Sequence, residues 1–277
     1  MHPYHGIIAA LLTKHGKEFQ IAPALQELSI TTQNVEFDTD LFGTFTGEVE
    51  REGNAYEVVI RKARKAQELS GLPYAIASEG SFAPDVQLPL LTSNVELLAW
   101  IDSVHGIEIV ESIRTFETQA RTLTVTSVDQ IESLLGEFGF PEHALIVRTM
   151  SGETPLIYKG LWHRNDVLKA AVTCWEIEPQ IVIENDLRAH MNPTRQSAIS
   201  KVAKKLVERL SHLCHFCGVP GWGVIGTLRG LHCQDCGELN PDYPVGEILG
   251  CQKCSAREEK RGAREQLDPA HCSYCNP

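Results

Sequence analysis

Four Cys-x-x-Cys pairs near the end of the chain constrain its fold more than any other feature. Two sulfurs on one tight turn can both reach the same ion, and in a chain without a secretory signal such pairs are typical of tetrahedral zinc sites. The pattern therefore predicts two structural zinc ions bound by eight of the nine cysteines, in the pairs Cys214/Cys217, Cys233/Cys236, Cys251/Cys254 and Cys272/Cys275.

The spacing of the pairs bears on how they share the two ions. Residues 218–232 separate the first two pairs and residues 255–271 the last two, which favours two successive zinc ribbons. A cross-braced pairing of alternate motifs stays open. Disulfide bonds are disfavoured because a chain without a secretory signal is expected in the reducing cytoplasm. A thioredoxin-like redox site is disfavoured because it needs only one such pair. Cys174, outside the pairs, is expected to be a buried helix residue.

The charge of the chain limits its partners. The 277 residues carry 25 Lys and Arg against 36 Asp and Glu, a net charge of −11. This field repels phosphate backbones and argues against nucleic-acid binding, although a local basic pocket can still hold a small anion. The first apolar run is too short for a membrane span and follows no basic residue, unlike a secretory signal. We therefore expect a cytoplasmic protein with no membrane partner.

Upstream of the cysteines, strand patterns alternate with helix patterns. Strands are expected in the segments 6–13, 30–37, 74–82, 95–102, 106–126, 144–149, 156–162 and 180–186. Helices are expected at 55–71, 127–140, 164–176 and after Asn192, which can cap a helix whose apolar stripe is Ile199, Val202, Leu206, Leu210 and Leu213. The predicted fold class is α/β, with a mixed sheet flanked by helices over residues 1–213 and a module of two zinc ribbons over residues 214–277.

Glu79 is the first candidate for a functional residue. The segment from Ala75 to Asp85 is an apolar strand pattern that gives way to Glu79, Gly80 and Ser81. If the strand ends there, the carboxylate faces the crevice where α/β proteins usually bind ligands. The alternative is that Glu79 is a solvated loop residue and Gly80 forms a turn.

Two further groups of polar residues are expected to join Glu79. Acidic residues between Glu36 and Glu50, including Glu48, could bind Mg²⁺ or orient water, and the residues assigned to that catalytic role are Asp38, Glu50 and Glu79. Basic residues near the first strand and before the last long helix are the predicted phosphate ligands: Lys14, His15, Lys17, Arg188, His190 and Arg195. For each group the alternative is ordinary surface charge, with Arg188 and Arg195 paired to local acids such as Glu184 and Asp186.

Over nearly its whole length the chain resembles an uncharacterised bacterial domain-of-unknown-function family, through "TKHGKE", "SEGSF", "DLRAHMNPTR", "CHFCGVPGWG" and "DPAHCSYCNP". Residues 7–82 also resemble the inosine triphosphate pyrophosphatase-like family. There, Thr13, His15 and Lys17 stand at the phosphate loop, "RKARKA" stands in the following helix, and "SEGSF" takes the place of an acidic metal-binding strand end. This second resemblance implies a pyrophosphatase-like architecture and pyrophosphohydrolase chemistry.

Together these features predict Mg²⁺-dependent binding of a nucleotide or other phosphorylated small molecule. If the protein is an enzyme, the expected reaction is pyrophosphohydrolysis of a nucleoside triphosphate. The alternative is a non-enzymatic protein whose zinc module binds a partner. Residues 214–277 carry six basic and eight acidic side chains, a balance of 6 − 8 = −2, and two Zn(Cys)₄ centres add about −4. The partner is then expected to be a protein rather than RNA.

Overall fold

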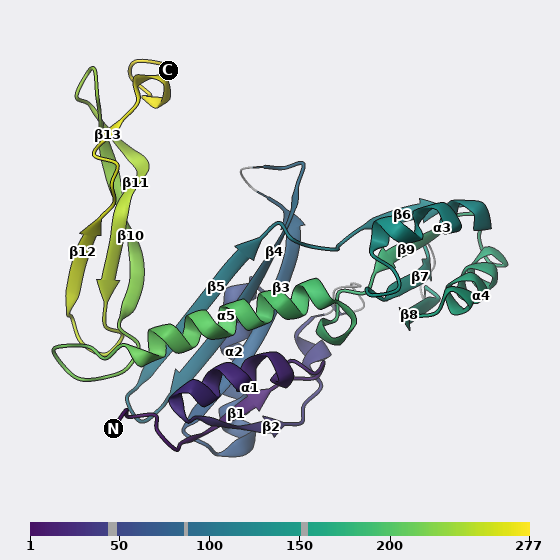
Figure 1. Cartoon of the computed structure of the whole chain (residues 1–277), viewed down its shortest axis with the longest axis horizontal. Coiled ribbons are helices and arrows are strands. Elements are labelled where there is room, and N and C mark those ends of the chain that lie inside the picture. Colours follow the sequence, from purple (N-terminus) through teal and green to yellow (C-terminus); the bar gives the residue numbers. More distant parts are fainter. Residues whose placement is uncertain (44–48, 86–87, 151–154) are drawn as a thin grey trace.

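The structure is a computed structural model with three parts. We call them the core lobe (residues 1–115 and 193–213), the inserted lobe (residues 116–192) and the C-terminal arm (residues 214–277), and Figure 1 shows all three. The residues that the structure describes are 1–43, 49–85, 88–150 and 155–277. In these ranges no helix combines the length and apolar character needed to cross a membrane.

The core lobe is built on a five-stranded mixed sheet, which confirms the predicted fold class. Its first three strands in spatial order run parallel to one another, and each of the last two runs antiparallel to the strand before it. The spatial order is β2 (Thr31–Val35), β1 (Ile8–Leu12), β3 (Tyr74–Pro84), β4 (Thr92–Asp102) and β5 (Ile107–Thr115).

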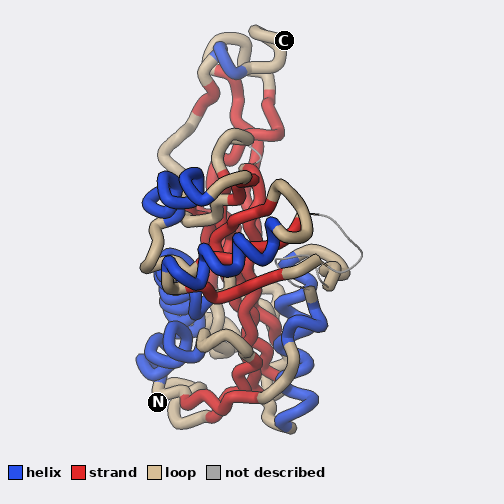
Figure 2. Tube along the Cα trace, turned by 90° about the vertical axis from the view of Figure 1, so that its right-hand side faces the viewer, coloured by secondary structure: helices blue, strands red, loops and turns tan. Residues whose placement is uncertain are grey.

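Helices cover both faces of this sheet, and Figure 2 shows them on either side of the strands. The covering helices are α1 (Glu18–Leu25), α2 (Ala55–Ser70) and α5 (Pro193–Ser211). Because side chains alternate along a strand, Ile76 and Leu98 pack with the apolar residues of α1 and α5. Their neighbours Ala77 and Leu97 pack on the other face with Val59 of α2. Each face of the sheet therefore has its own apolar layer.

Local sequence signals account for the ends of the two long helices. Asn54 and Glu57 form a reciprocal capping box at the start of α2, which ends at Gly71 in the left-handed conformation. The Asn192 side chain accepts from the Arg195 amide and Pro193 is the first residue of α5, as expected. The predicted apolar stripe of α5 is buried except at Leu213, which lies beyond the helix end and is exposed.

The inserted lobe carries a second sheet that the sequence analysis did not foresee. All its strand pairs are antiparallel, and two helices pack on it through a separate apolar core that includes Cys174, buried in a helix as predicted. The sheet order is β6 (Thr122–Val125), β9 (Ile181–Asn185), β7 (Leu145–Thr149) and β8 (Ile157–Leu161), with α3 (Val128–Leu134) and α4 (Arg164–Trp175).

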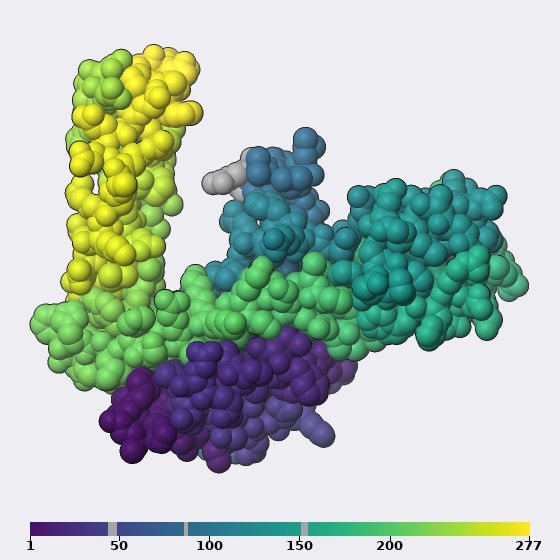
Figure 3. Space-filling view, viewed as in Figure 1, coloured from purple at the N-terminus to yellow at the C-terminus, as the bar shows by residue number. Residues whose placement is uncertain are grey.

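The C-terminal arm is a narrow β structure that stands away from the two lobes (Figure 3). It begins directly after α5 and is built on one long antiparallel pair of strands. Its strands are β10 (Gly223–Cys233), β11 (Leu239–Gly250), β12 (Arg257–Arg261) and β13 (Gln266–Leu267). The 3₁₀ helices of the described chain are η1 (Gln26–Leu28), η2 (Thr39–Phe42), η3 (Leu135–Phe138), η4 (Ala189–Met191) and η5 (Pro269–His271).

Candidate functional site

A cleft of about 270 Å³ lies between the core lobe and the inserted lobe. Among the described residues its lining includes eight basic side chains against four acidic ones, so the balance is 8 − 4 = +4 in a chain whose net charge is −11. The basic residues are Lys14, Lys17, Arg51, Lys62, Arg121, Lys159, Arg188 and Arg195, and the acidic ones are Asp40, Glu79, Glu184 and Asp186. Such a local excess of positive charge favours an anionic ligand.

Glu79 lines this cleft, but the expectation that it ends a strand is wrong. It lies in the middle of β3, opposite Leu97 of β4, and only 6% of the residue is exposed. On the α2 side of the sheet, Lys62 Nζ donates to Glu79 Oε2 at 2.5 Å, and Arg51 Nη2 lies 2.9 Å from Oε1. The strand continues because β4 pairs with it as far as Pro84, so the carboxylate is held in an ion-pair network instead of facing open solvent.

Gly80 makes room for a second buried ion pair on the opposite face of β3. Arg195, at the start of α5, donates from Nε to Glu96 Oε1 at 2.6 Å, and both residues are almost fully buried. Glu96 is the cross-strand neighbour of Gly80, and a Cβ at position 80 would collide with the Arg195 guanidinium and the Glu96 carboxylate. The glycine in the Glu-Gly-Ser segment is therefore required for close approach of charged groups, and it does not form a turn.

Lys17 is the most unusual side chain of the cleft. It is the N-cap residue of α1 and only 8% exposed, and its amine makes no hydrogen bond or ion pair with any described residue. Burial, together with the nearby cations Arg195 and Lys62, lowers the pKa of Lys17 to about 7. The preceding Gly16 has a positive φ of 68°, which allows the tight turn from β1 into α1 that brings this lysine into the cleft.

The other residues of the β1–α1 loop are paired more conventionally. Lys14 Nζ lies 2.6 Å from Asp38 Oδ1 and 2.5 Å from Asp40 Oδ2, and these hydrogen bonds raise the pKa of Lys14. The His15 ring stacks on that of His190 with centroids 5.2 Å apart. Burial lowers the pKa of His15 to about 4 and also lowers the pKa of His190, so both imidazoles are neutral at pH 7.

The structure brings most of the predicted phosphate ligands together. Lys14, His15, Lys17, Arg188 and Arg195 all line the cleft, and His190 contacts it through His15. The alternative, that these arginines pair with acids nearby in sequence, also holds for Arg188, which pairs with Asp186 at 2.5 Å. Arg195 pairs instead with Glu96, which is distant in sequence, and Glu184 pairs with Arg148. These residues therefore share one site, and their role in ligand binding stays a prediction.

The predicted catalytic carboxylates do not converge. Asp38 forms an ion pair with Lys14 and does not line the cleft, and Glu50 is exposed and is not among the lining residues. Glu48 lies outside the described residues. A Mg²⁺ ion prefers carboxylates that are free to accept it, whereas Glu79, Asp38 and Asp40 are each held by a basic side chain. This donor set does not fit the predicted magnesium site.

Four basic residues of the cleft were missed by the sequence analysis: Arg51, Lys62, Arg121 and Lys159. A signal was present for Lys62. It follows Val58 by four residues and Val59 by three, so helical periodicity places it on the buried face of α2, where it is 6% exposed. A lysine on an apolar helix face indicates a buried partner, here Glu79. The other three come from a loop and from the unforeseen inserted lobe, and no local pattern marked them.

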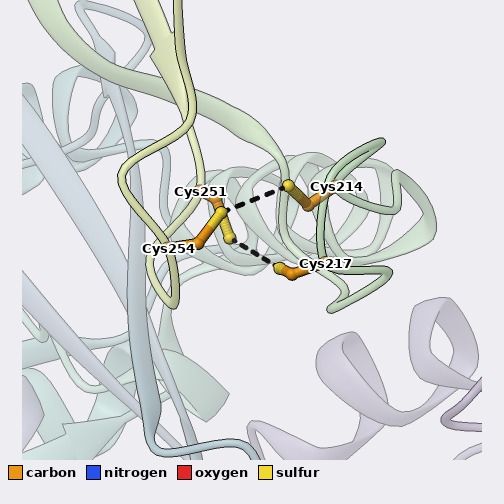
Figure 4. Close-up of side chains that lie close together, drawn as sticks. All are labelled: Cys214, Cys217, Cys251 and Cys254. Carbon is orange, nitrogen blue, oxygen red and sulfur yellow. Dashed lines mark hydrogen bonds between the residues drawn. The ribbon is translucent and has the colours of Figure 1, made fainter.

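The eight paired cysteines form two clusters in the arm. Within each cluster the sulfur atoms lie within 4.8 Å of one another, and the pairing is cross-braced: Cys214, Cys217, Cys251 and Cys254 form the base cluster, and Cys233, Cys236, Cys272 and Cys275 form the distal cluster. This is the arrangement that the sequence left open, and the successive pairing that the spacing favoured is wrong. The base cluster, drawn in Figure 4, joins the start of the arm to the turn after β11.

The sulfur geometry fits tetrahedral zinc. A Zn–S bond of about 2.3 Å in tetrahedral geometry separates the sulfurs by about 3.8 Å. The Cys214–Cys254 and Cys217–Cys251 distances are 3.7 and 3.6 Å. In the distal cluster, Cys233 and Cys275 lie 3.8 Å apart. Each cluster can therefore hold one zinc ion with all four ligands supplied by the protein, which is typical of structural zinc.

Comparisons with known proteins place the chain in a family and assign no activity. The family model described as "Domain of unknown function (DUF6671)" matches residues 62–277. The chain belongs to the DUF6671 family. No curated protein and no solved structure matches it, so the resemblance to inosine triphosphate pyrophosphatases is not shown. The DUF6671 match includes both cysteine clusters and the cleft residues from Lys62 onward, and it begins after the β1–α1 loop and Arg51.

Proposed function

We propose that the cleft binds a phosphorylated small molecule such as a nucleotide, while two zinc ions stabilise the C-terminal arm. The observation that carries the proposal is the convergence of basic side chains from both lobes on one cleft in an acidic protein. An anion binding there exchanges its water shell for charge-assisted hydrogen bonds from fixed donors. Lys17 adds a buried amine that no described residue engages, which is a group suited to a ligand oxygen.

Phosphate binding and hydrolysis require different groups in the cleft. Binding needs cationic donors, which line the cleft. Hydrolysis also needs a group that activates water, and Glu79, the predicted candidate, is already held by Lys62 and Arg51. Pyrophosphohydrolysis of a nucleoside triphosphate and its dependence on Mg²⁺ therefore stay predictions, to be tested by measuring phosphate or pyrophosphate release.

Calorimetric titration with pyrophosphate and with nucleoside triphosphates, each with and without Mg²⁺, tests the binding proposal. We expect Arg188→Ala to weaken binding roughly tenfold or more, the effect of losing one charge-assisted hydrogen bond. Arg114→Ala is the matched control, because Arg114 pairs with Asp85 and does not line the cleft. Negligible binding by wild type and both variants would remove the proposal.

That negative outcome would favour the alternative of a non-enzymatic interaction protein. The arm stands away from the two lobes in Figure 3, so its surface is open on several sides. A protein partner for the arm stays a prediction. The anion titration separates the two functions, because a partner that binds only the arm does not require the cleft to bind phosphate.

A further inference from the structure

The surroundings of Lys17 leave it without a countercharge of its own. The charged groups that face it are Lys62 from α2, Arg195 from α5, Glu79 from β3 and Glu96 from β4. Both carboxylates are already paired, Glu79 with Lys62 at 2.5 Å and Glu96 with Arg195 at 2.6 Å. A proton on Lys17 would therefore add a positive charge to a buried site in which both nearby carboxylates are already paired with other cations.

A buried amine in this position favours its neutral form. Desolvation penalises the ammonium ion, and the adjacent cations repel it; together they lower the pKa of Lys17 to about 7. His15, on the same loop, is also neutral near pH 7 because burial lowers its pKa to about 4. With Lys17 neutral, the described lining carries seven basic and four acidic side chains, a balance of 7 − 4 = +3, and protonation of Lys17 raises the balance to +4.

We propose that Lys17, a buried amine with no ion-pair partner among the described residues, makes the cleft selective for dianionic oxyanions by taking up a proton when a dianion binds. The proton comes from solvent and bonds to the free electron pair of Nζ. A phosphate monoester or pyrophosphate supplies the second negative charge that stabilises the ammonium form. A monoanion such as a phosphate diester brings only one negative charge, so it stabilises the ammonium form of Lys17 less. The inference rests on the proposed function and adds the charge state of the ligand.

Sulfate is the probe that isolates this effect, since it is a tetrahedral dianion that carries no titrating proton in the neutral and alkaline range. Calorimetric titration of the full-length, zinc-loaded protein in two buffers of different ionisation enthalpy gives the number of protons taken up per sulfate bound. We expect uptake approaching about one proton near pH 8 to 9. Near pH 6 the uptake falls toward zero, because Lys17, with its pKa of about 7, is then already protonated in the free protein.

Three variants separate charge from structure. Lys17→Met should abolish proton uptake and weaken sulfate and pyrophosphate binding roughly tenfold. Lys17→Arg keeps a permanent charge, so it should bind sulfate without proton uptake and with little dependence on pH. Lys65→Met is the matched control, because Lys65 pairs with Glu68 on the outer surface of α2 and should behave as wild type.

Three outcomes would overturn the inference while leaving the proposed function intact. The first is equal proton uptake by wild type and Lys17→Met. The second is competition by dimethyl phosphate as strong as that by sulfate. Competitive acetylation of the ligand-free protein gives an independent measurement, since a neutral amine is acylated at lower pH. A labelling profile for Lys17 like that of an ordinary lysine, together with intact pyrophosphate binding, also overturns the inference alone. Absence of binding by both anions overturns the proposed function and this inference with it.

Discussion

Arg195 reaches from the first turn of α5 to Glu96 in β4, and its Nε donates to Glu96 Oε1 at 2.6 Å across the position of Gly80. The pair has almost no exposed surface. Arg195 Nη1 also donates to the Leu187 carbonyl at 2.5 Å, at the point where the chain returns from the inserted lobe. This one arginine therefore joins the sheet, the last long helix and the chain segment between the lobes.

Gly80→Ala is expected to destabilise the protein. The added methyl group would meet the Arg195 guanidinium and the Glu96 carboxylate, so the ion pair must shift or stretch. Overpacking of this kind lowers the free energy of unfolding by about 1–3 kcal/mol. Urea unfolding followed by circular dichroism measures it. Gly136→Ala is the control, since open space surrounds that position. Unchanged stability of Gly80→Ala would show that the pair does not need this glycine.

Glu79→Gln distinguishes an ion-pair role for Glu79 from the predicted metal-binding role. Removing the carboxylate charge leaves Lys62 and Arg51 without their partner, so we expect a lower free energy of unfolding, by roughly 1–3 kcal/mol. The cleft also becomes more positive, so pyrophosphate should bind more tightly without Mg²⁺. Calorimetry and urea unfolding give the two values. If Glu79 binds Mg²⁺ instead, the variant should weaken Mg²⁺-dependent binding and leave stability unchanged.

Paired cysteine substitutions test the cross-braced arrangement by counting zinc. Cys214→Ser with Cys251→Ser removes two ligands of the base cluster, so the chain should retain one zinc ion at the distal cluster. Cys214→Ser with Cys233→Ser removes one ligand from each cluster, so it should lose most of both ions. Elemental analysis of purified protein measures the ratio. Successive ribbons would give the reverse pattern, and wild-type protein without zinc would contradict the zinc prediction itself.

Cys233→Ser alone should affect only the far end of the arm. Its cluster is distal, and the small apolar core around Leu231 and Leu267 depends on the same segment. We expect loss of one zinc ion and local unfolding there, with the core lobe still folded. Limited proteolysis that maps cleavage sites gives the answer. Early cleavage in the core lobe would show that the distal cluster stabilises more than the arm.

The stability of the core lobe should fall in mild acid because of His15. Burial lowers the pKa of His15 from 6.5 to about 4 in the folded protein. Below pH 6.5 the unfolded chain therefore binds a proton that the folded chain does not, and stability decreases as the pH falls from 6.5 toward 4. Urea unfolding at several pH values should show a loss on the order of 1–2 kcal/mol, which His15→Gln reduces. His5→Gln, at an exposed site, should keep the wild-type dependence.

Local sequence decided the elements of this protein. Asn54 with Glu57, and Asn192 with Pro193, mark two helix starts through contacts that span only three residues. Each Cys-x-x-Cys turn likewise places two sulfurs together without help from the rest of the chain. For this reason most strands of the two lobes, the helices α2 to α5 and the candidate zinc ligands could be predicted from the sequence, whereas α1 was not among the expected helices.

Only the tertiary structure decided which of these elements meet. The pairing of Cys214 with Cys254, of Glu79 with Lys62 and of Arg195 with Glu96 joins residues that are distant in sequence. Charge and residue type do not specify such partners, because any basic residue can satisfy a given acid until packing fixes its position. The same reason explains why Glu79 was expected at an open strand end: the pairing of β3 with β4 buries it, and no local pattern contains that information.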